Sequence, residues 1–517
     1  MASANTGTVY LIGAGPGDPD LITVRGRRLL NDCRAVVYDN LVPFELIVTL
    51  PATTEKHYVG KQAGKSCRSQ EEINRLLVRL ASEGKNVARL KGSDPLIFGR
   101  GAEEAQYLKK NGIRFEIVPG VTSGIAAPVY AGIPCTDRDR ASFVLFVTGH
   151  KAADKAVSDV PWEWVAKANH GTVVIYMGVG EISDIVTSLV EKGMPAETAA
   201  AVIERGTFPS QRVFTTTLAE LPRTVTTQDV RSPALFVLGK VVELRPIMQW
   251  FEARPLLGVR VMVTRPADQA QPMYDSLRQL GAEVSACPTI ATAEHIDDNG
   301  WQAFEKLSSE NRWLVFTSEN GVRYFMRQFF SQWPDVRRLG CFRIAALGHG
   351  TAGALARYNL KADFVPTEAT TAAFAQQLAG SRSWENSEVV RVRGNLSVDN
   401  IDRSLAAAGA GVLPLTVYRT FHPTWPEGLT EKLLQYPPDV ITFTSGTSVT
   451  GLFEILPADN VKSILSGAKV LTIGPATSAV AREHGLDVTI EARRHSIPAM
   501  IDELVAYATE HSLRRSS

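Results

Sequence analysis

The stretch "LIGAGPGDPDLITVRG" (Leu11–Gly26) places three glycines between an apolar run and a segment typical of a helix. Strand, glycine turn and helix in this order indicate an α/β fold with a ligand loop at the end of a strand. No Gly-Lys-Ser/Thr follows, and the glycine spacing is not that of a dinucleotide loop. Pro16 also removes a backbone N–H and fixes φ, which is unfavourable for cradling phosphate. The loop therefore favours a ligand that lacks phosphate.

A tight turn with close backbone approach suits S-adenosylmethionine, which joins an adenosine, a sulfonium and an amino acid. Other features of the chain exclude whole classes of partner. At 517 residues and a net charge of +1, it is expected to hold more than one domain and to bind no nucleic acid. No apolar run approaches the roughly 20 residues of a membrane helix. The five scattered cysteines and the polar start "MASANTGT" indicate a cytoplasmic protein without a metal site.

A domain boundary is expected within "VVELRPIMQWFEARPLLGVRVMVTRP" (241–266), where one strand pattern ends and another begins. Pro246 and Pro255 bracket the segment between them. We expect one domain over residues 1–244, a linker over 245–257 and a second domain over 258–517. In the first domain, apolar strands end in glycine, small or acidic residues, as in a parallel α/β fold with functional loops at the strand ends.

The second domain contains a repeat. "WLVFTSENGVRYF" (313–325) resembles "VITFTSGTSVTGLF" (440–453), and two glycine turns recur at nearly the same offset. Each copy predicts strand, Thr-Ser turn, helix, strand, glycine turn and helix. Two such copies imply two α/β lobes with parallel sheets that face each other across a cleft.

Small polar residues end the predicted strands of both copies. Helix N-termini and hydroxyl groups at these turns could bind a ligand with several separated carboxylates. Simple helix capping is the alternative for each residue taken alone. The matched set predicts substrate binding by Thr317, Ser318, Asn320, Thr444, Ser445 and Thr447.

An ordered series of motifs over about residues 258–510 resembles uroporphyrinogen-III synthase. The motifs are "VMVTRP", "VFTSENGV", "ALGHGTA", "VRGNLS", "LTVYRTF", "TFTSGTSV" and "IGPATSA". The resemblance implies closure of the linear tetrapyrrole hydroxymethylbilane with inversion of its last ring. It also implies that Tyr418, in "LTVYRTF", assists departure of the hydroxyl group. A buried core tyrosine is the competing interpretation of Tyr418.

A second series, over about residues 8–244, resembles uroporphyrinogen-III C-methyltransferase. It comprises "GAGPGDPDLITVRG", "YDNLV", "GKQAG", "RLKGSDPLIFGRG" and "VPGVTSGIAAPVYAGIP". The resemblance implies the tetrapyrrole methylase fold of two α/β lobes, a homodimer, and S-adenosylmethionine as cofactor. It implies cofactor contacts at Pro16, Gly92, Ser93, Asp94, Ile97, Thr122, Ser123, Met177, Gly206 and Ala234. Ser93 departs from the Gly-Gly-Asp of the family, and its hydroxymethyl group could narrow the turn or point to solvent.

The same resemblance implies Asp39 as the base and Lys61 as the acid in methylation of uroporphyrinogen III. A surface ion pair, worth little in energy, is the alternative for these two residues. The substrate carries eight carboxylates, so Arg100 is predicted to bind one of them in a bidentate manner. An arginine beside a glycine turn can equally be an ordinary surface residue.

Together the two resemblances predict a bifunctional enzyme of tetrapyrrole biosynthesis. The second domain would make uroporphyrinogen III, and the first would methylate it twice to precorrin-2, towards sirohaem or cobalamin. Two other possibilities stay open from sequence: a methylase of a later cobalamin precursor, and a non-catalytic tetrapyrrole-binding protein with one decayed half.

Overall fold

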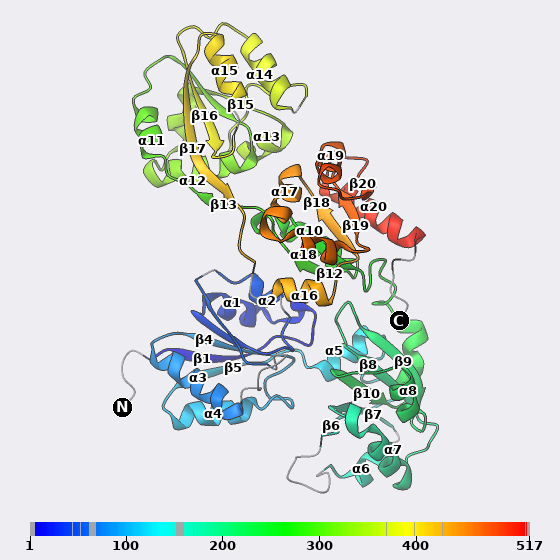
Figure 1. The fold of residues 1–517 in the computed structure, drawn as a ribbon. Coiled ribbons are helices and arrows are strands. Elements are labelled where there is room, and N and C mark those ends of the chain that lie inside the picture. Colours follow the sequence, from blue (N-terminus) through cyan, green and yellow to red (C-terminus); the bar gives the residue numbers. More distant parts are fainter. Residues whose placement is uncertain are drawn as a thin grey trace.

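The computed structural model describes residues 6–513 apart from residues 44, 52, 61–68, 151–159, 169, 369, 398, 426–427 and 512. The chain forms four α/β lobes, each built on a five-stranded sheet. The first two lobes lie side by side, and the last two are stacked above them (Figure 1). The predicted two-lobed α/β architecture of each half is confirmed.

The first lobe has a fully parallel sheet in the order β3-β2-β4-β1-β5. Its central strands β2, β4 and β1 are largely buried, because helices cover both sides of a parallel sheet, and β4 also carries the buried charges of Arg89 and Lys91. A capping box at Ser69 and Glu72 starts the long helix α3. The elements are β1 (Thr8–Gly13), η1 (Pro19–Leu21), α1 (Val24–Asp32), β2 (Ala35–Tyr38), α2 (Glu45–Val48), β3 (Glu55–Tyr58), α3 (Gln70–Ser82), β4 (Val87–Lys91), α4 (Gly101–Lys110) and β5 (Arg114–Val118).

The second lobe differs from the expected parallel sheet. Its order is β6-β7-β10-β8-β9, and β10 runs antiparallel to both of its neighbours. The link between β8 and β9 is too short for the crossover that parallel strands need, so these two strands also pair antiparallel. The elements are α5 (Ser123–Tyr130), β6 (Phe143–Thr148), α6 (Trp162–Ala166), β7 (Gly171–Tyr176), η2 (Val179–Glu181), α7 (Ile182–Glu191), β8 (Ala199–Glu204), β9 (Arg212–Thr217), α8 (Leu221–Thr227) and β10 (Ala234–Leu238).

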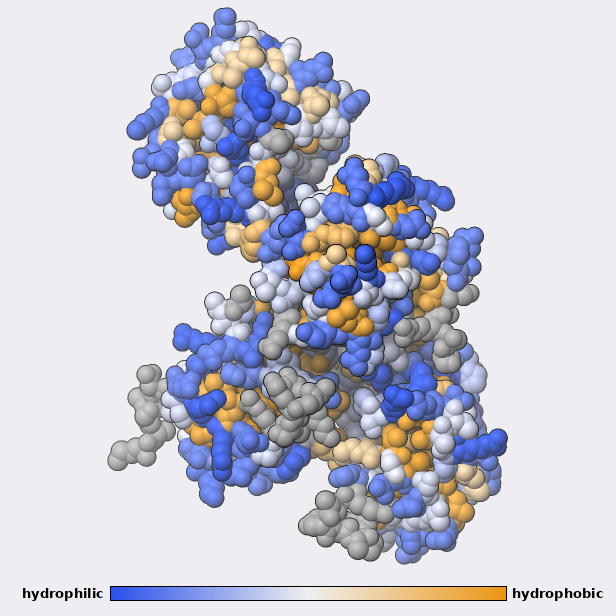
Figure 2. Space-filling model, viewed as in Figure 1, coloured by the Kyte–Doolittle hydropathy of each residue, from blue (hydrophilic) through white to orange (hydrophobic). Residues whose placement is uncertain are grey.

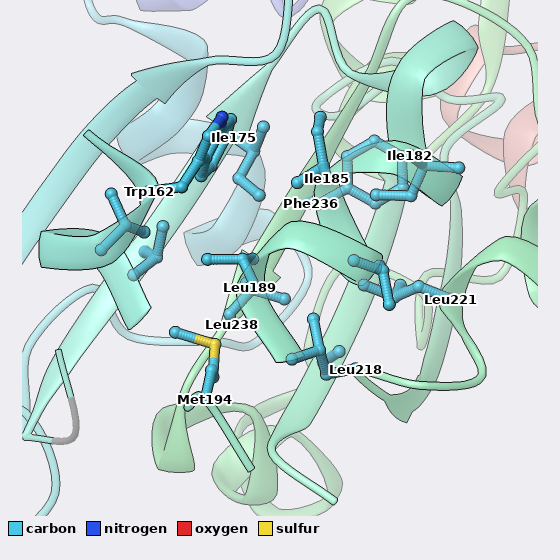
Figure 3. Close-up of a cluster of buried hydrophobic side chains, with 14 of the residues drawn as sticks. Trp162, Ile175, Ile182, Ile185, Leu189, Met194, Leu218, Leu221, Phe236 and Leu238 are labelled. Atoms are coloured by element: carbon cyan, nitrogen blue, oxygen red, sulfur yellow. The ribbon is translucent and has the colours of Figure 1, made fainter. Parts of the chain in front are cut away.

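The core of the second lobe packs α7 and α8 against one face of this sheet (Figure 3). Phe236, Ile175 and Leu189 are completely or almost completely buried there. Each such side chain contributes about 1.5–3 kcal/mol relative to an exposed one. This packing fixes strand β7, whose last residue, Tyr176, contacts Thr122 and Gly124 at the start of α5.

The predicted linker is folded. It begins with α9 (Arg245–Met248), directly after η3 (Lys240–Leu244) of the first domain, and continues as a turn-rich segment to residue 257. Phe251 packs its ring 4.9 Å from that of Tyr130 in the first domain, and the Trp250 indole donates to a carbonyl of α5. Leu256 is completely buried in the core of the second domain. The connection therefore ties the two domains together through buried side chains.

The third lobe is built from two separate parts of the chain. Its parallel sheet has the order β12-β11-β18-β19-β20. Two hydrophobic clusters cover the two faces. The elements are β11 (Arg260–Val263), α10 (Ala267–Gln279), β12 (Glu283–Ala286), α16 (Leu429–Gln435), β18 (Val440–Phe443), α17 (Gly446–Ile455), α18 (Ala458–Leu465), β19 (Lys469–Thr472), α19 (Pro475–Glu483), β20 (Val488–Glu491) and α20 (Ile497–Glu510).

The fourth lobe is inserted between these two parts. Its sheet has the order β13-β17-β16-β14-β15, parallel except for the edge strand β13. The chain leaves the third lobe along β13 and returns along β17 (Figure 1). The elements are β13 (Ala291–Glu294), α11 (Asp298–Glu305), β14 (Asn311–Phe316), α12 (Glu319–Gln332), η4 (Val336–Cys341), β15 (Phe342–Ala346), α13 (His349–Ala356), α14 (Thr371–Gly380), β16 (Ser387–Gly394), α15 (Asn400–Ala407) and β17 (Gly411–Phe421).

The surface mixes polar and apolar residues over all four lobes (Figure 2). Among the helices that the structure describes, none combines the length and apolar character needed to cross a membrane.

Two candidate active sites

The glycine turns of the first domain meet at one point. A Cβ added to Gly13 would lie 2.5 Å from the Cα of Gly120 and 2.7 Å from the carbonyl oxygen of Ser93. The N–H of Ser93 donates to the carbonyl of Gly15 over 2.7 Å. Three strand ends therefore approach more closely than residues with side chains would permit. The structure thus brings the predicted loops together at the carboxyl edge of the sheet.

The Asp94 carboxylate holds two of these loops in place. It accepts hydrogen bonds from the N–H groups of Leu96 at 2.8 Å, Ile97 at 3.2 Å and Gly120 at 2.9 Å. Both Asp94 carboxylate oxygens therefore accept hydrogen bonds from the backbone. We expect Asp94 to affect cofactor binding by fixing the shape of these loops. The Ser93 hydroxyl accepts from the N–H of Ser123 at 3.2 Å, an outcome that neither sequence alternative anticipated.

The predicted Thr122–Ser123 turn is joined to the second lobe by Tyr176, which sequence reasoning missed. The Tyr176 hydroxyl lies 2.8 Å from the Thr122 hydroxyl and accepts from the N–H of Gly124 at 2.8 Å. Burial is the main cause that raises the Tyr176 pKa. Tyr176 directly precedes Met177, which was predicted to contact the cofactor. A tyrosine within a buried strand cannot be distinguished from an ordinary core residue by sequence alone, so Tyr176 was not predicted.

Exposed apolar side chains surround these turns. Met177 has a left-handed φ of 55° and is 49% exposed, and Ile97 is 37% exposed. A Cβ on Gly206 would lie 2.2 Å from that of Ala127, so the backbone there also packs closely. Ala234 starts β10, immediately after the cis Ser232–Pro233 bond. Narrow glycine walls with an apolar rim suit a flat, uncharged ring and the apolar carbon groups around a sulfonium, and therefore fit an adenosyl sulfonium ligand.

Asp39 lies at the end of β2, beside a buried arginine. Its Oδ2 is 3.4 Å from the guanidinium of Arg89, and its Oδ1 accepts from the N–H of Leu41 at 3.1 Å. The Arg89 side chain is only 4% exposed, so the partner of Asp39 in the described part of the chain is a buried arginine. Lys61 lies outside the described residues.

Arg89 belongs to a buried charge cluster that the sequence did not reveal. Glu104, with a completely buried side chain, accepts from Arg89 at 3.2 Å, Lys91 at 2.9 Å and Gln70 at 3.0 Å. Burial raises the pKa of Glu104, but the charges of Arg89 and Lys91 outweigh it, and the pKa lies below its usual value. Burial also lowers the pKa of Lys91, and the Arg89 charge adds to this. The alternation of charged and apolar residues in "ARLKG" is the sequence pattern from which a buried charge cluster on this strand could have been predicted.

Arg100 lies at the N-terminus of α4 and has a partner within the protein. Its guanidinium binds Glu103 with two hydrogen bonds of 2.9 and 2.7 Å, and its side chain is 57% exposed. This bidentate pair is the geometry predicted for a substrate carboxylate, formed here with a carboxylate of the chain itself. An exposed pair of this kind exchanges partners at little cost.

In the second domain, Tyr418 lies on β17 of the fourth lobe. Its hydroxyl is 3.2 Å from that of Ser318, and its ring stacks on that of Tyr324 at 5.6 Å. Tyr418 is half-buried and also packs against the hydrophobic core of the lobe, so its role in catalysis stays a prediction. Ser318 also caps α12 by accepting from the N–H of Gly321 at 3.0 Å. Thr317 directly follows β14 and is half-buried.

The matching turn of the third lobe has the same construction. Ser445 caps α17 in a capping box with Ser448, and its hydroxyl lies 2.9 Å from that of Thr447. Thr444 precedes it at the end of β18 and is half-buried. The capping interpretation therefore holds for the two serines, whereas their threonine neighbours are left as candidates for a ligand.

The two lobes of the second domain touch through the predicted residue Asn320 and through Gln269, Arg323 and Asp268, which sequence reasoning missed. The Asn320 side chain accepts from that of Gln269 at 3.2 Å, and Arg323 pairs with Asp268 at 2.6 Å. A cavity of about 360 Å³ beside this contact is lined by Thr292, Arg323, Tyr324 and Arg327, among others. Its arginines add the positive charge that a carboxylate-rich ligand requires.

The fold and the sites define a two-domain protein in which a methylase-type cleft precedes a two-lobed cleft with hydroxyl-bearing strand ends. Residues 8–222 match the Tetrapyrrole (Corrin/Porphyrin) Methylases, and residues 271–502 match Uroporphyrinogen-III synthase HemD. The porphyrin biosynthesis protein HemD of Ruminiclostridium josui is 36% identical over 502 residues, which cover 96% of this chain and 98% of that protein. The chain belongs to this family, which fuses the two kinds of domain.

Two further relatives match the first half. An S-adenosyl-L-methionine-dependent uroporphyrinogen III methyltransferase of Methanosarcina barkeri is 48% identical over 48% of this chain and 96% of that protein. The uroporphyrin III C-methyltransferase structure from Thermus thermophilus is 38% identical, covers 46% of this chain and 100% of its own, and gives a TM-score of 0.40. The chain spans about half the length of the siroheme synthases that it also matches.

Proposed function

We propose that the second domain closes hydroxymethylbilane to uroporphyrinogen III and that the first domain methylates this product twice, with S-adenosylmethionine, to precorrin-2. One observation carries the proposal: a glycine-walled cleft with the Asp39–Arg89 pair occurs in the same chain as a cleft with hydroxyl-bearing strand ends and arginines. The product of one cleft is the expected substrate of the other. We assign residues 1–244 and 258–517 to these two activities.

In the first cleft, the turns at Gly92–Asp94 and Thr122–Ser123 would hold the cofactor, with Ile97 and Met177 against its apolar parts. When bound, S-adenosylmethionine supplies an electrophilic methyl group. A pyrrole carbon of the substrate forms the new C–C bond as the S–CH₃ bond breaks, and a proton must then leave the macrocycle. Asp39, held by Arg89, is positioned to accept that proton. Lys61 is proposed as the acid from the family resemblance alone.

In the second cleft, loss of the terminal hydroxyl of hydroxymethylbilane as water needs a proton. The Tyr418 hydroxyl, 3.2 Å from that of Ser318, is proposed to donate it. Arg323 and Arg327 would bind acetate and propionate groups of hydroxymethylbilane. Thr317 and Thr444 would add hydrogen bonds to the same substrate from the ends of strands in the two lobes. The domain thereby holds the flexible substrate so that ring closure occurs at the inverted position.

The direct test is to supply hydroxymethylbilane to the full chain, with and without S-adenosylmethionine, and to separate the products by isomer and mass. Without the cofactor, the expected product is the type III isomer, since spontaneous closure gives type I. With it, the product should gain two methyl groups. Type I product alone would refute the synthase assignment. Type III product that stays unmethylated would refute the methylase assignment and leave a methylase of a later precursor to be tested.

We also propose a homodimer formed through the methylase domain, as the family resemblance implies. Light scattering of the full chain during size-exclusion chromatography measures the mass directly. A mass of one chain at micromolar concentration would contradict this part of the proposal.

A further inference from the structure

A cavity of about 450 Å³ lies where the third lobe meets both lobes of the first domain. Figure 1 shows helix α16 of the second domain resting above the first domain, and Lys432 on this helix lines the cavity. The volume is within the range of small-molecule sites. The roles proposed above use none of the residues that the second domain places here.

On the side of the first domain, the wall adjoins the methylase cleft. Gly17 belongs to the first glycine turn, Asn40 follows the proposed base Asp39, and Arg205 precedes Gly206. A group bound in the cavity would therefore lie next to a ligand in the cleft.

On the side of the second domain, the wall is the amino edge of the third-lobe sheet. Arg260 begins β11 and Glu283 begins β12, and both line the cavity. The proposed synthase residue Thr444 follows β18 at the opposite, carboxyl edge of the same sheet. The cavity is therefore separate from the synthase cleft.

The wall is positively charged on balance. Its cationic side chains are Arg205, Arg254, Arg260, Arg278 and Lys432, against the carboxylates of Asp18, Glu45 and Glu283. Arg260 is already bound to Asp439 at 3.0 Å. Arg205 uses its Nε to bind the Ser210 hydroxyl at 2.7 Å, which anchors the guanidinium at the cavity.

Arg278 is the cation that best fits an external anion. Its guanidinium lies 3.8 Å from Asp275 on the same helix, a long contact, and 5.6 Å from the ring of Tyr274. Burial lowers the pKa of Arg27 in the first domain; Asp20 opposes that shift, and the charge of Arg278 adds to it. The positive charge of Arg278 therefore acts on a guanidinium of the first domain, and an anion bound beside Arg278 would offset this repulsion.

We propose that the synthase domain completes the substrate site of the methylase domain. Arg278, assisted by Arg205 across the cavity, binds side-chain carboxylates of the tetrapyrrole while the reacting ring occupies the methylase cleft. The inference rests on the proposed function, which gives that cleft a substrate with eight carboxylates. The cavity is sized for one edge of such a macrocycle, and the bidentate fork of an arginine matches a carboxylate.

The test measures methylation of added uroporphyrinogen III by the full chain and its variants. Arg278→Gln is expected to raise KM about tenfold, as for loss of one charge-assisted hydrogen bond, with kcat little changed. Arg205→Gln, on the other wall, should raise the same KM, and Arg278→Lys should restore part of it. Arg343→Gln, at an exposed position of the fourth lobe, is the matched control and should leave KM unchanged. The rate of hydroxymethylbilane closure and the isomer ratio of its product should be equal in Arg278→Gln and wild type. Equal values also show that the variant is folded.

Unchanged KM in both Arg278→Gln and Arg205→Gln would overturn the inference while the proposed function stands. If the wild-type chain did not methylate uroporphyrinogen III, the proposed function would fail. The inference would then be tested by the dissociation constant of uroporphyrin III, measured by titration of the wild-type chain, Arg278→Gln and Arg343→Gln. Weaker binding by Arg278→Gln than by wild type and Arg343→Gln supports the shared site. Equal binding by all three proteins overturns it.

Discussion

The Asp39 carboxylate lies 3.4 Å from the guanidinium of Arg89, a residue in the middle of the neighbouring strand β4. Arg89 in turn contacts Glu104, which also binds Lys91. The proposed base of methylation is therefore the exposed end of a buried charge cluster, and its orientation depends on residues well below the cleft surface.

Asp39→Asn should lower methylation turnover at saturating substrate by about 100-fold, within the range of general acid–base catalysis, because an amide cannot accept the proton. Affinity for S-adenosylmethionine, measured by calorimetry, should stay the same. Asp32→Asn, at the exposed end of α1, is the control and should retain full turnover. Wild-type turnover in Asp39→Asn would exclude Asp39 as the base.

Glu104→Gln should destabilise the first domain by about 3 kcal/mol, because it leaves Arg89 and Lys91 buried with no full counter-charge. Glu103→Gln, one residue earlier but exposed, should cost less than about 1 kcal/mol. Urea unfolding, followed by the fluorescence of the chain, gives both values. Equal losses in the two variants would show that the buried cluster adds nothing beyond a surface pair.

The same residue makes stability depend on pH. The pKa of Glu104 is lowered in the folded protein, so its contribution is complete above the ordinary carboxyl value of about 4.3 and is lost as the pH falls through the folded value. The stability difference between wild type and Glu104→Gln should therefore shrink as the pH falls below about 4.3. Thermal melts of both proteins between neutral and acid pH measure this difference. A difference that grows on acidification would contradict the assigned direction of the shift.

Asp94→Ala should weaken S-adenosylmethionine binding about tenfold or more, because three backbone N–H groups lose their acceptor and the turn loses its shape. Asp94→Asn keeps one carbonyl oxygen for the contacts to Leu96 and Ile97 and should lose less. Calorimetry compares both with Asp139→Ala, a change at an exposed loop aspartate. Unaltered affinity in Asp94→Ala would remove this loop from the cofactor site.

Tyr418→Phe should shift the product of hydroxymethylbilane closure towards the type I isomer, because the proposed proton donor and the contact to Ser318 are lost. The rings of Phe and Tyr stack alike on Tyr324, so the fold should be retained. Tyr358→Phe, at a half-buried position near the end of α13, is the matched control. An unchanged isomer ratio and rate in Tyr418→Phe would favour a structural role for this tyrosine.

Part of the site was predictable because glycine is a local signal. The turns at Gly13, Gly92 and Gly120 could be proposed from sequence, and the structure brings them together. The repeat around Thr317 and Thr444 likewise predicted two similar lobes, and each residue directly follows a strand, β14 and β18. The antiparallel β10 was not predicted, because a buried strand has the same apolar composition in either direction.

The sequence by itself determined the element order, the two-domain organisation and the loops that carry glycine, hydroxyl and carboxylate groups, since each is a property of neighbouring residues. Only the tertiary structure decided which side chains meet across those elements. Arg89 reaches Asp39 through strand pairing, Asp94 is committed to backbone N–H groups of two loops, and Arg278 of one domain faces the cleft of the other. Such contacts join residues far apart in the chain, and their distances follow from how the lobes pack.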